Sequence, residues 1–409
     1  MAHMSEEGLE QKYIKEAFDT NWVAPLGPNV NAFEKDLENF VSEGKRVVAL
    51  SSGTAAVHLG LLACGVGPGD EVLVQSFTFC ASTHPITYLG ATPVLVDSEP
   101  ETWNIDPDLL EEAIKDRIEK TGKKPKAIVP VALYGMPYNA ERIMEIADRY
   151  GIPVVEDAAE GLGSRYKGQV LGTFGRFGVM SFNGNKMITT SGGGALICPD
   201  DELWQKIMWY ATQARESYPY YQHEAIGYNY RLSNVCAGIG RGQMTVLNDH
   251  LAHHKHVQAL YEELLKDVPG IHVHSQPAGG DYDSNYWLCT ITIDPEVRIK
   301  GQENAYKTIV KGAVGGAAGV IHMASSAVTD CQPNDNVEAL RVLMDQAGIE
   351  ARPVWKPMHK QPVYKDVPAY VNGVSEAIFK IGMCLPAGPN VSEEDVRYIA
   401  ETIKNAIIK

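Results

Sequence analysis

The sequence has no CxxC pair, no long apolar run and no excess of basic residues. Its seven cysteines are scattered and odd in number, which argues against a disulfide framework and against a zinc site. We therefore expect no bound metal and a reducing, cytoplasmic location. No apolar run is long enough to span a bilayer, so no membrane partner is expected. The formal net charge of −15 argues against binding to a phosphate backbone, and nucleic acid is not expected as a partner.

The composition is ordinary for a soluble globular protein. The hydrophobic fraction is 44% and the charged fraction is 21%, both near the usual values. A chain of 409 residues has room for about two domains. The first residues are acidic and amphipathic rather than apolar, so they do not predict a signal peptide.

Between Val47 and Ala195, short β-branched runs alternate with amphipathic helical stretches. Apolar runs of this kind, separated by helices, are typical of a mostly parallel sheet that is covered on both faces. The first part of the chain therefore predicts an α/β domain. The expected strands are VVAL (47–50), EVLVQS (71–76), TPVLVD (92–97), KAIVPVAL (126–133), IPVVED (152–157) and GVMSF (178–182).

The later part of the chain has a different pattern. A long helix is expected at Leu247–Leu265, a strand at 286–293 and a final helix at 392–407, which together predict a smaller α+β domain. We place the large domain at residues 5–250 and the small domain at 251–409. The glycine- and alanine-rich segment from Arg298 to Asp335 is expected to elaborate the small domain.

A candidate anion site follows the first expected strand. The run SSGTAA (51–56) lies where a strand passes into a helix, and free N–H groups at such a helix start can hold a phosphate. Gly53 permits close approach of the backbone. The alternative is a simple serine or threonine cap on the helix. The GxGxxG fingerprint of a dinucleotide site is missing here, which disfavours a dehydrogenase.

A candidate carboxylate follows another strand. In VVEDAAE (154–160), Asp157 comes at the end of an apolar run. Ligands bind at the carboxyl ends of parallel strands, so Asp157 is well placed to hold a protonated ring nitrogen. The alternative is an aspartate that caps a following helix.

The run SFNGNKMITTSGGGALI (181–197) contains a single lysine, Lys186, and no other charge lies between Phe177 and Pro199. An isolated lysine is usually a solvated surface cation, but nucleophilic use requires a desolvated setting such as these apolar and small neighbours provide. A buried amine beside a phosphate site and a strand-end carboxylate is typical of a pyridoxal phosphate enzyme.

Four motifs occur together and in order: SSGTAA, EDAAE, SFNGNK followed by TTSGGG, and GYNYRLSN (227–234). With them the chain resembles, from about Asn21 to the C-terminus, the DegT/DnrJ/EryC1/StrS family of pyridoxal phosphate-dependent nucleotide-sugar aminotransferases. The resemblance implies fold type I, the aspartate aminotransferase-like fold. Some relatives carry histidine in place of the lysine and are dehydratases, so Lys186 favours amino transfer.

The resemblance also implies roles for individual residues. Lys186 would form the internal aldimine with pyridoxal 5′-phosphate and later shuttle a proton, while Asp157 would pair with the pyridinium nitrogen. Glu160 falls where many relatives have glutamine near the cofactor O3′. The other residues expected around the cofactor are Gly53, Thr54 and Ser181 at the phosphate, Phe79 stacked on the ring (or else an ordinary core residue), and Asn229 reaching the partner subunit's cofactor.

Because Asn229 would complete the partner's site, the expected active unit is a homodimer. The implied reaction takes an amino group from L-glutamate and gives it to a nucleotide-diphosphate keto sugar. Two stretches resemble segments that line the sugar and diphosphate, the loop at 21–29 and RPVWKPMH (352–359). The expected substrate-binding residues are Pro25, Gly27, Ala55, Trp355, Lys356 and His359; the last two could supply positive charge to the diphosphate, or be surface or packing residues.

Substrate is less well specified than reaction class. The forms LGPNV, YQHEAIGYNYRLSN and RPVWKPMH are most similar to the bacillosamine-type branch, which aminates C4 of UDP-4-keto-6-deoxy-N-acetylglucosamine. GDP-perosamine synthases and C3 aminotransferases stay open, since one or two pocket side chains can decide between them. A pyridoxal phosphate-binding regulator without catalytic activity and a lyase or dehydratase of the same fold are the alternatives from other classes.

Overall fold

The computed structural model describes residues 2–306 and 331–408. In this part of the chain, eight strands form a central sheet in the order β1-β9-β8-β5-β4-β2-β3-β14. Two isolated parallel bridges, Ile128 to Val154 and Val131 to Asp157, join its halves. Adjacent strands of this sheet pair in parallel, except that β9 is antiparallel to both β1 and β8. The strands are β1 (Arg46–Leu50), β2 (Glu71–Gln75), β3 (Thr92–Val96), β4 (Ala127–Val129), β5 (Val155–Asp157), β8 (Phe177–Ser181), β9 (Gly194–Cys198) and β14 (Ala369–Tyr370).

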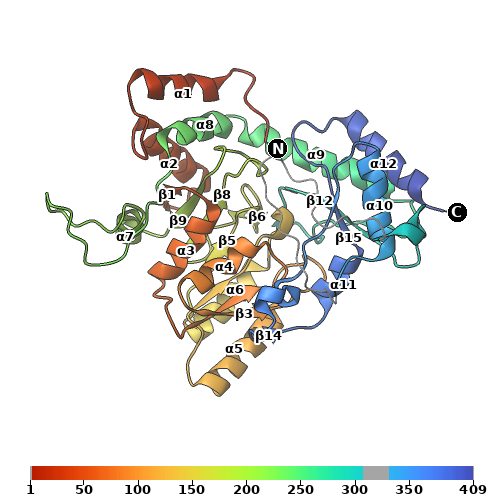
Figure 1. Ribbon diagram of the computed structural model, residues 1–409, viewed down its shortest axis with the longest axis horizontal. Helices are drawn as coiled ribbons and strands as arrows, with labels where there is room; N and C mark the ends of the chain where they lie inside the picture. The colour runs from red at the N-terminus through yellow and green to blue at the C-terminus, as the bar shows by residue number, and fades with distance from the viewer. Residues whose placement is uncertain (1, 307–330, 409) are drawn as a thin grey trace.

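Helices cover this sheet because the strands are apolar on both faces. Residues of β2 alternate between two hydrophobic clusters: Val72 and Val74 belong to a cluster with α3, and Leu73 belongs to a cluster with α5 and α6. The expected mostly parallel α/β layer is therefore confirmed (Figure 1). The helices of this part are α1 (Leu9–Asp19), α2 (Pro28–Val41), α3 (Gly53–Ala63), α4 (His84–Tyr88), α5 (Pro107–Thr121), α6 (Ala140–Tyr150), α7 (Asp201–Ala211) and α8 (Asn234–Met244).

Local sequence signals set the ends of several helices. The side chains of Asp106 and Asn139 accept hydrogen bonds from the first turns of α5 and α6, as N-cap residues do. Gly122 and Gly151 follow the same two helices in the left-handed conformation, which glycine adopts without strain. These signals lie within a few residues of the helix, so the sequence alone predicts them.

The second domain has an antiparallel sheet in the order β10-β12-β15-β13, which α9, α10 and α12 cover (Figure 1). Its elements are β10 (Ile271–Val273), β12 (Cys289–Ile293), β13 (Arg352–Pro353), β15 (Gly382–Leu385), α9 (Leu247–Leu265), α10 (Asp335–Gln346), α11 (Val374–Ile381) and α12 (Glu393–Ala406). A third sheet consists of β6 (Arg165–Tyr166), β7 (Gln169–Val170) and β11 (Tyr282–Asp283). The short 3₁₀ turns are η1 (Cys80–Ser82), η2 (Leu133–Gly135), η3 (Gln302–Asn304), η4 (Met358–Lys360) and η5 (Pro362–Tyr364).

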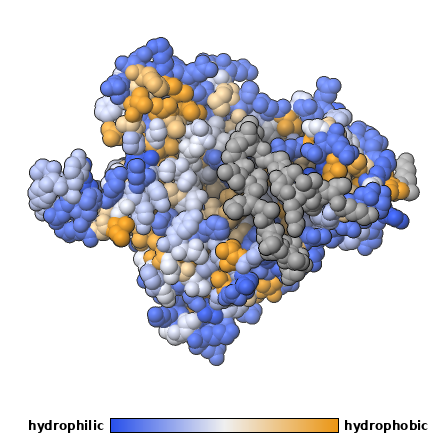
Figure 2. Space-filling model, viewed as in Figure 1, coloured by the Kyte–Doolittle hydropathy of each residue, from blue (hydrophilic) through white to orange (hydrophobic). Residues whose placement is uncertain are grey.

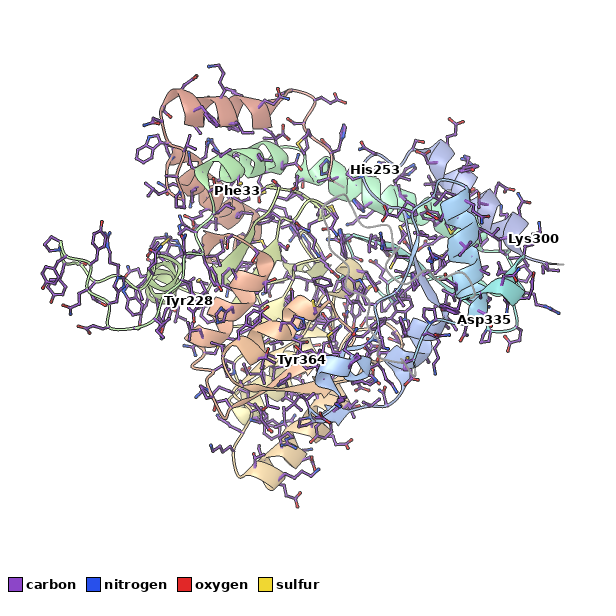
Figure 3. All side chains as sticks on the ribbon, viewed as in Figure 1. Phe33, Tyr228, His253, Lys300, Asp335 and Tyr364 are labelled. Carbon is purple, nitrogen blue, oxygen red and sulfur yellow. The ribbon has the colours of Figure 1, made fainter. Side chains whose placement is uncertain are left out.

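The two parts of the chain are interlaced. Strand β14 comes from the last quarter of the sequence and pairs in parallel with β3 of the large sheet. Tyr364 also lies over the large domain, where its hydroxyl is 2.5 Å from His84 Nδ1 (Figure 3). Most of the segment expected to elaborate the small domain, residues 307–330, lies outside the described residues.

Two surface features stand out. The chain between α7 and α8 forms an arm that projects away from the small domain (Figure 1), and it exposes Tyr218, Tyr220, Tyr221 and Ile226. Apolar residues also gather on the surface over α1 and α2 (Figure 2), where Phe18, Trp22, Val23 and Leu26 are exposed. Among the described helices, none is long and apolar enough to cross a membrane.

Candidate active site

Lys186 lies in the loop between β8 and β9, and its side chain is only 13% exposed. The Nζ atom donates a hydrogen bond of 3.0 Å to Glu160 Oε1 and lies 4.0 Å from the centre of the Trp287 ring. The ammonium group of a surface lysine is surrounded by water, with no carboxylate bound to it and no aromatic ring packed against it. The amine is instead held inside the fold between a carboxylate and an aromatic face.

Glu160 is the carboxylate that holds this amine. Its second oxygen, Oε2, accepts a hydrogen bond of 2.8 Å from the Tyr134 N–H, so both oxygens have donors. Burial raises the pKa of Glu160, and the nearby Lys186 ammonium opposes that rise. A carboxylate needs such partners because burial of an unpaired charge is strongly unfavourable.

Asp157 is the last residue of β5 and is buried. Its Oδ2 accepts a hydrogen bond of 2.6 Å from the Ser82 hydroxyl, and its Oδ1 accepts one of 3.1 Å from the Ala159 N–H. Burial raises the pKa of Asp157, and the hydrogen bond from Ser82 opposes the rise. In the described structure no helix begins after β5 until α7, so Asp157 is not the helix cap that the sequence left open.

The residues expected to bind an anion lie in the first turn of α3. The Ser52 side chain caps the helix through the Ala55 N–H at 3.0 Å, as the capping interpretation expects. A Cβ atom at Gly53 would lie only 3.0 Å from the Ser181 Cβ. Glycine therefore lets the end of β8, with the Ser181 hydroxyl, lie against the free N–H groups of the helix start. Thr54 follows in the same turn and is partly exposed.

Phe79 is 52% exposed, which is unlike an ordinary core phenylalanine. It precedes η1, the turn that contains the Ser82 partner of Asp157. Its ring lies 5.4 Å from that of Trp355, and Trp355 lies 5.0 Å from Tyr134 and 6.2 Å from Trp287. An aromatic surface thus extends from Phe79 to the tryptophan that covers Lys186.

The other expected substrate residues divide into two groups. Pro25 is exposed and Ala55 is buried with its N–H bonded to Ser52. Gly27 has a packing reason of its own, because a Cβ there would lie 2.7 Å from the Asn234 side chain and its φ is +143°. Trp355, in contrast, belongs to the aromatic cluster beside Lys186.

The two residues expected to supply positive charge, Lys356 and His359, both contact groups of the chain itself. Lys356 Nζ donates to the Cys331 carbonyl at 3.0 Å. His359 Nδ1 lies 2.7 Å from the Ser76 hydroxyl, and burial lowers the pKa of His359. The lowered pKa of His359 favours its neutral form, which adds no charge for a diphosphate, so the expected positive charge rests on Lys356 and stays a prediction.

Asn229 is exposed and bridges Thr212 at the base of the projecting arm. Arg231 anchors this end of the arm: its Nη1 donates to the Ala49 carbonyl at 3.0 Å and also bonds to buried Glu34. Tyr228 marks the position of the segment beside α7 (Figure 3). Asn229 therefore lies outside the set of contacts around Lys186 of its own subunit.

Comparison with known proteins identifies the family of this chain. The sequence profile of the DegT/DnrJ/EryC1/StrS aminotransferase family matches residues 4–404. The chain belongs to this family. The assignment confirms the predicted class, a pyridoxal phosphate-dependent sugar aminotransferase of fold type I.

Individual relatives of the aminotransferase cover nearly the whole chain. EpsN of Bacillus subtilis (strain 168), named as a pyridoxal phosphate-dependent aminotransferase, is 42% identical over 98% of this chain and 93% of its own. The GDP-perosamine synthase of Escherichia coli O157:H7 is 33% identical over 97% of this chain and 95% of its own. The crystal structure of a DegT DnrJ EryC1 StrS aminotransferase from Brucella abortus has a TM-score of 0.82 at 28% identity, covering 98% of this chain and 95% of that chain.

The residues of the aminotransferase fit pyridoxal phosphate. The start of α3 offers free N–H groups beside Gly53, where even a Cβ atom would crowd Ser181. Asp157 is a buried anion that gains from a cationic ring nitrogen, and Phe79 exposes an aromatic face close to it. The buried amine of Lys186 completes a donor set that suits an aromatic aldehyde with a phosphate group.

Several residues of this site were not predicted from the sequence. They are Ser82, Tyr134, Asn285 and Trp287. Ser82 lies only three residues after Phe79 in SFTFCAS. A search for hydroxyl groups that follow the other expected strands could therefore have identified it as a partner of Asp157. Tyr134 directly follows an expected strand and Trp287 lies within another, but the local sequence does not indicate that these segments and Asn285 come together at Lys186.

Proposed function

We propose that this aminotransferase transfers the amino group of L-glutamate to a 4-keto-6-deoxy nucleotide sugar, UDP-4-keto-6-deoxy-N-acetylglucosamine. The observation that supports this most is the buried Lys186 amine, which contacts Glu160 at 3.0 Å and the Trp287 ring at 4.0 Å. Pyridoxal phosphate, when bound, supplies an electron sink for the carbanion that forms when an amino acid loses its α-proton. Every other task falls to residues of the chain.

Lys186 is proposed to hold the cofactor covalently and, when released, to accept and return the substrate proton at Nζ. Asp157 is proposed to accept a hydrogen bond from the protonated ring nitrogen and keep that proton in place. The Ser82 and Ala159 donors fix the carboxylate for this task. Gly53, Thr54 and Ser181 are proposed to hold the phosphate at the positive end of α3.

Glu160 is proposed to orient the amine. Its two oxygens accept from Lys186 Nζ and from the Tyr134 N–H, so the carboxylate cannot turn away without losing the second bond. A glutamine here would have to offer an N–H₂ group to one of two donors. An ionised glutamate, whose two oxygens only accept hydrogen bonds, therefore suits the two donors that contact Glu160.

The substrate is proposed on sequence similarity and on the uncharged aromatic surface beside Lys186. Phe79 and Trp355, which are exposed and partly exposed, suit the apolar face of a 6-deoxy sugar, and buried Tyr134 packs behind Trp355. A GDP-linked sugar is the main alternative, because a GDP-perosamine synthase is 33% identical over most of the chain. Amination at C3 is the other.

A homodimer is proposed as the active unit, in the cytoplasm. Asn229 and the tyrosines of the arm are exposed, as expected for a segment that reaches the partner's cofactor. The apolar surface over α1 and α2, with Phe18 and Leu26 exposed, also favours association. A cytoplasmic location agrees with the unpaired state of all seven cysteines, which lie in the described residues.

The reaction class can be tested by absorbance. The purified protein should be yellow, and L-glutamate should bleach it as the amino group is transferred. Lys186→Ala should abolish both amino transfer and borohydride trapping of the cofactor, while Lys15→Ala, which changes an exposed lysine, should retain both. A yellow protein that is indifferent to every amino donor would support the regulator alternative and contradict this proposal.

The substrate requires a separate assay. A panel of UDP-, GDP- and dTDP-linked keto sugars, each with glutamate as donor, should give the highest kcat/KM with UDP-4-keto-6-deoxy-N-acetylglucosamine. A higher value with the GDP-linked sugar would replace the proposed substrate. The position of the new amine, read by NMR of the product, separates C4 from C3 amination.

A further inference from the structure

The main chain on both sides of Lys186 is held by side chains from elsewhere in the fold. The Asn185 carbonyl accepts a hydrogen bond of 2.7 Å from the Trp287 indole Nε1–H. The Met187 carbonyl is 3.1 Å from His250 Nδ1, which must donate because a carbonyl can only accept. The loop is thereby held at the carbonyl groups of the two residues that flank its lysine.

Trp287 makes a second contact with the same residue. Its ring centre lies 4.0 Å from Lys186 Nζ, within the range where the face of an indole attracts a cation. The side chain is 4% exposed, so its position is set by packing. One tryptophan therefore restrains both the backbone and the amine of Lys186.

Trp287 is itself fixed by its neighbours. Its N–H donates to Asn285 Oδ1 at 2.8 Å, and Asn285 Nδ2 donates to the carbonyls of Glu160 and Leu162 at 2.8 and 2.9 Å. On α9, His254 Nδ1 lies 2.9 Å from the Tyr286 carbonyl. Since His250 and His254 are one helical turn apart, the same helix face holds the lysine loop and the tryptophan segment in register.

We propose that Trp287 is a positioning residue for Lys186, and that His250 and His254 on α9 fix its segment relative to the lysine loop. This proposal rests on one part of the proposed function, namely that Lys186 carries the reactive amine. The contacts are all between residues of the chain itself. They can therefore be tested on the unloaded protein, whatever substrate it uses.

The test is the rate at which acetic anhydride labels Lys186 in cofactor-free protein, followed by mass spectrometry of the peptide that contains it. Trp287→Leu removes the ring from the amine and should raise the labelling rate about tenfold. Trp287→Phe keeps an aromatic face over Nζ and should stay within about twofold of the unchanged protein. The proposal would be overturned if Lys186 were labelled at the same rate in both variants, whether that rate is raised or unchanged.

Trp204 provides a matched control in the same chain. Its Nε1–H donates to the Val47 carbonyl at 3.0 Å, and the Arg46 guanidinium lies 4.5 Å from its ring centre, so it makes the same two kinds of contact away from Lys186. Trp204→Leu should leave labelling of Lys186 unchanged. A rise as large as that of Trp287→Leu would mean general loosening of the fold and would contradict a positioning role.

Trp287→Phe also supplies a second readout if the leucine variant does not fold. It keeps a ring over Nζ, and with it the labelling rate, but loses the hydrogen bond to the Asn185 carbonyl. We therefore expect kcat to fall roughly tenfold because the amine is less precisely oriented, with KM for L-glutamate unchanged. A rise in KM at constant kcat would overturn the proposal. Failure of the wild-type protein to use glutamate would instead refute the proposed function and leave the labelling result standing.

Discussion

Asp157 is a charged side chain in a place where charge is unfavourable. It is buried, and its pKa is raised mainly by that burial, against the hydrogen bonds from Ser82 and Ala159. A raised pKa means that the folded protein binds a proton at Asp157 more tightly than the unfolded chain does. Its contribution to stability is therefore greatest at low pH and is lost as pH rises through the folded pKa.

Asp157→Asn should stabilise the cofactor-free protein at neutral pH. The asparagine keeps the acceptor for the Ala159 N–H but removes the buried charge, so we expect the Tm at pH 7 to rise by about 2 °C or more. The gain should shrink as pH falls below the raised pKa and should vanish below about pH 3.9, where the carboxyl of the unfolded chain is also protonated. Thermal unfolding of both proteins from pH 3 to pH 8 checks this; a Tm that falls at neutral pH contradicts it.

The residues of the site differ in how far sequence could predict them. Asp157 ends one strand that begins with an apolar run, Lys186 comes shortly after another, and strand ends in a parallel sheet meet at one edge. Trp287 and Tyr134 reach the same place through irregular backbone, since Tyr134 has a φ of +55° and the residue before Trp287 has a φ of +48°. No periodic pattern encodes such conformations, so only the folded structure brings these aromatics to the lysine.

The Gly192-Gly193-Gly194 run shows how one motif combines separate requirements. Packing explains two of these three glycines. A Cβ at Gly193 would lie 2.2 Å from Thr190 Oγ1, and one at Gly194 would lie 2.4 Å from the Gly53 N atom. Gly194 thus lets β9 run against the start of α3, where the phosphate is proposed to bind.

Replacement of these glycines by alanine should give unequal results. Gly194→Ala forces a methyl group into the start of α3 and should reduce the free energy of unfolding by about 3 kcal/mol, with weaker retention of pyridoxal phosphate. Gly192 is exposed, and a Cβ there would meet no atom within 4 Å, so Gly192→Ala should change neither property. Chemical denaturation and cofactor absorbance measure both effects. Equal behaviour of the two variants would show that the packing account is wrong.

Helix α2 has its N-terminal cap supplied by another element. Gly27 precedes the helix and has no side chain to cap it, while Asn234 Oδ1 accepts from the N–H groups of Asn29 and Val30 at 2.9 and 3.2 Å. Asn234 Nδ2 also donates to the Trp22 carbonyl at 2.9 Å. The last residue of GYNYRLSN therefore holds the N-terminal loop against α8.

Asn234→Ala should reduce the free energy of unfolding by about 1–2 kcal/mol, the usual effect of losing a helix cap. The amides of Asn29 and Val30 should exchange with deuterium faster than in the unchanged protein. Asn234→Asp keeps the acceptor oxygen and should retain most of the protection at both amides. Unchanged exchange in the alanine variant would mean that these N–H groups have other partners.

At the scale of the whole molecule, apolar runs predicted six of the strands of the large sheet. Each is buried on both faces, which is the condition that produces such runs. Strand β14 was not predicted, because its two residues, Ala369 and Tyr370, are too short to carry a period. The two-residue strands β6, β7 and β11 escaped prediction for the same reason. The apolar composition of the sequence therefore predicts the long strands, whereas the short strands depend on tertiary contacts that local sequence does not encode.

The proposed homodimer predicts complementation between two inactive chains. If Asn229 serves the partner's cofactor, a mixed dimer of Lys186→Ala and Asn229→Ala chains has one site with both residues intact. Equal co-expression should then restore about a quarter of wild-type activity, since half of randomly formed dimers are mixed and each has one working site. Activity of the mixture no higher than that of the two variants alone would place Asn229 in its own subunit's site or outside any site.

The cap of α2 has a consequence for synthesis of the chain. Asn29 and its acceptor Asn234 are separated by 205 positions, and ribosomes add roughly 5–20 residues per second. The nascent N-terminal helix therefore waits roughly 10–40 s for its cap to be translated. During that interval α2 can pack on β1 but lacks α8, the other element that covers its hydrophobic side in the folded chain, so the emerging N-terminal segment exposes apolar surface to chaperones that bind unfinished chains.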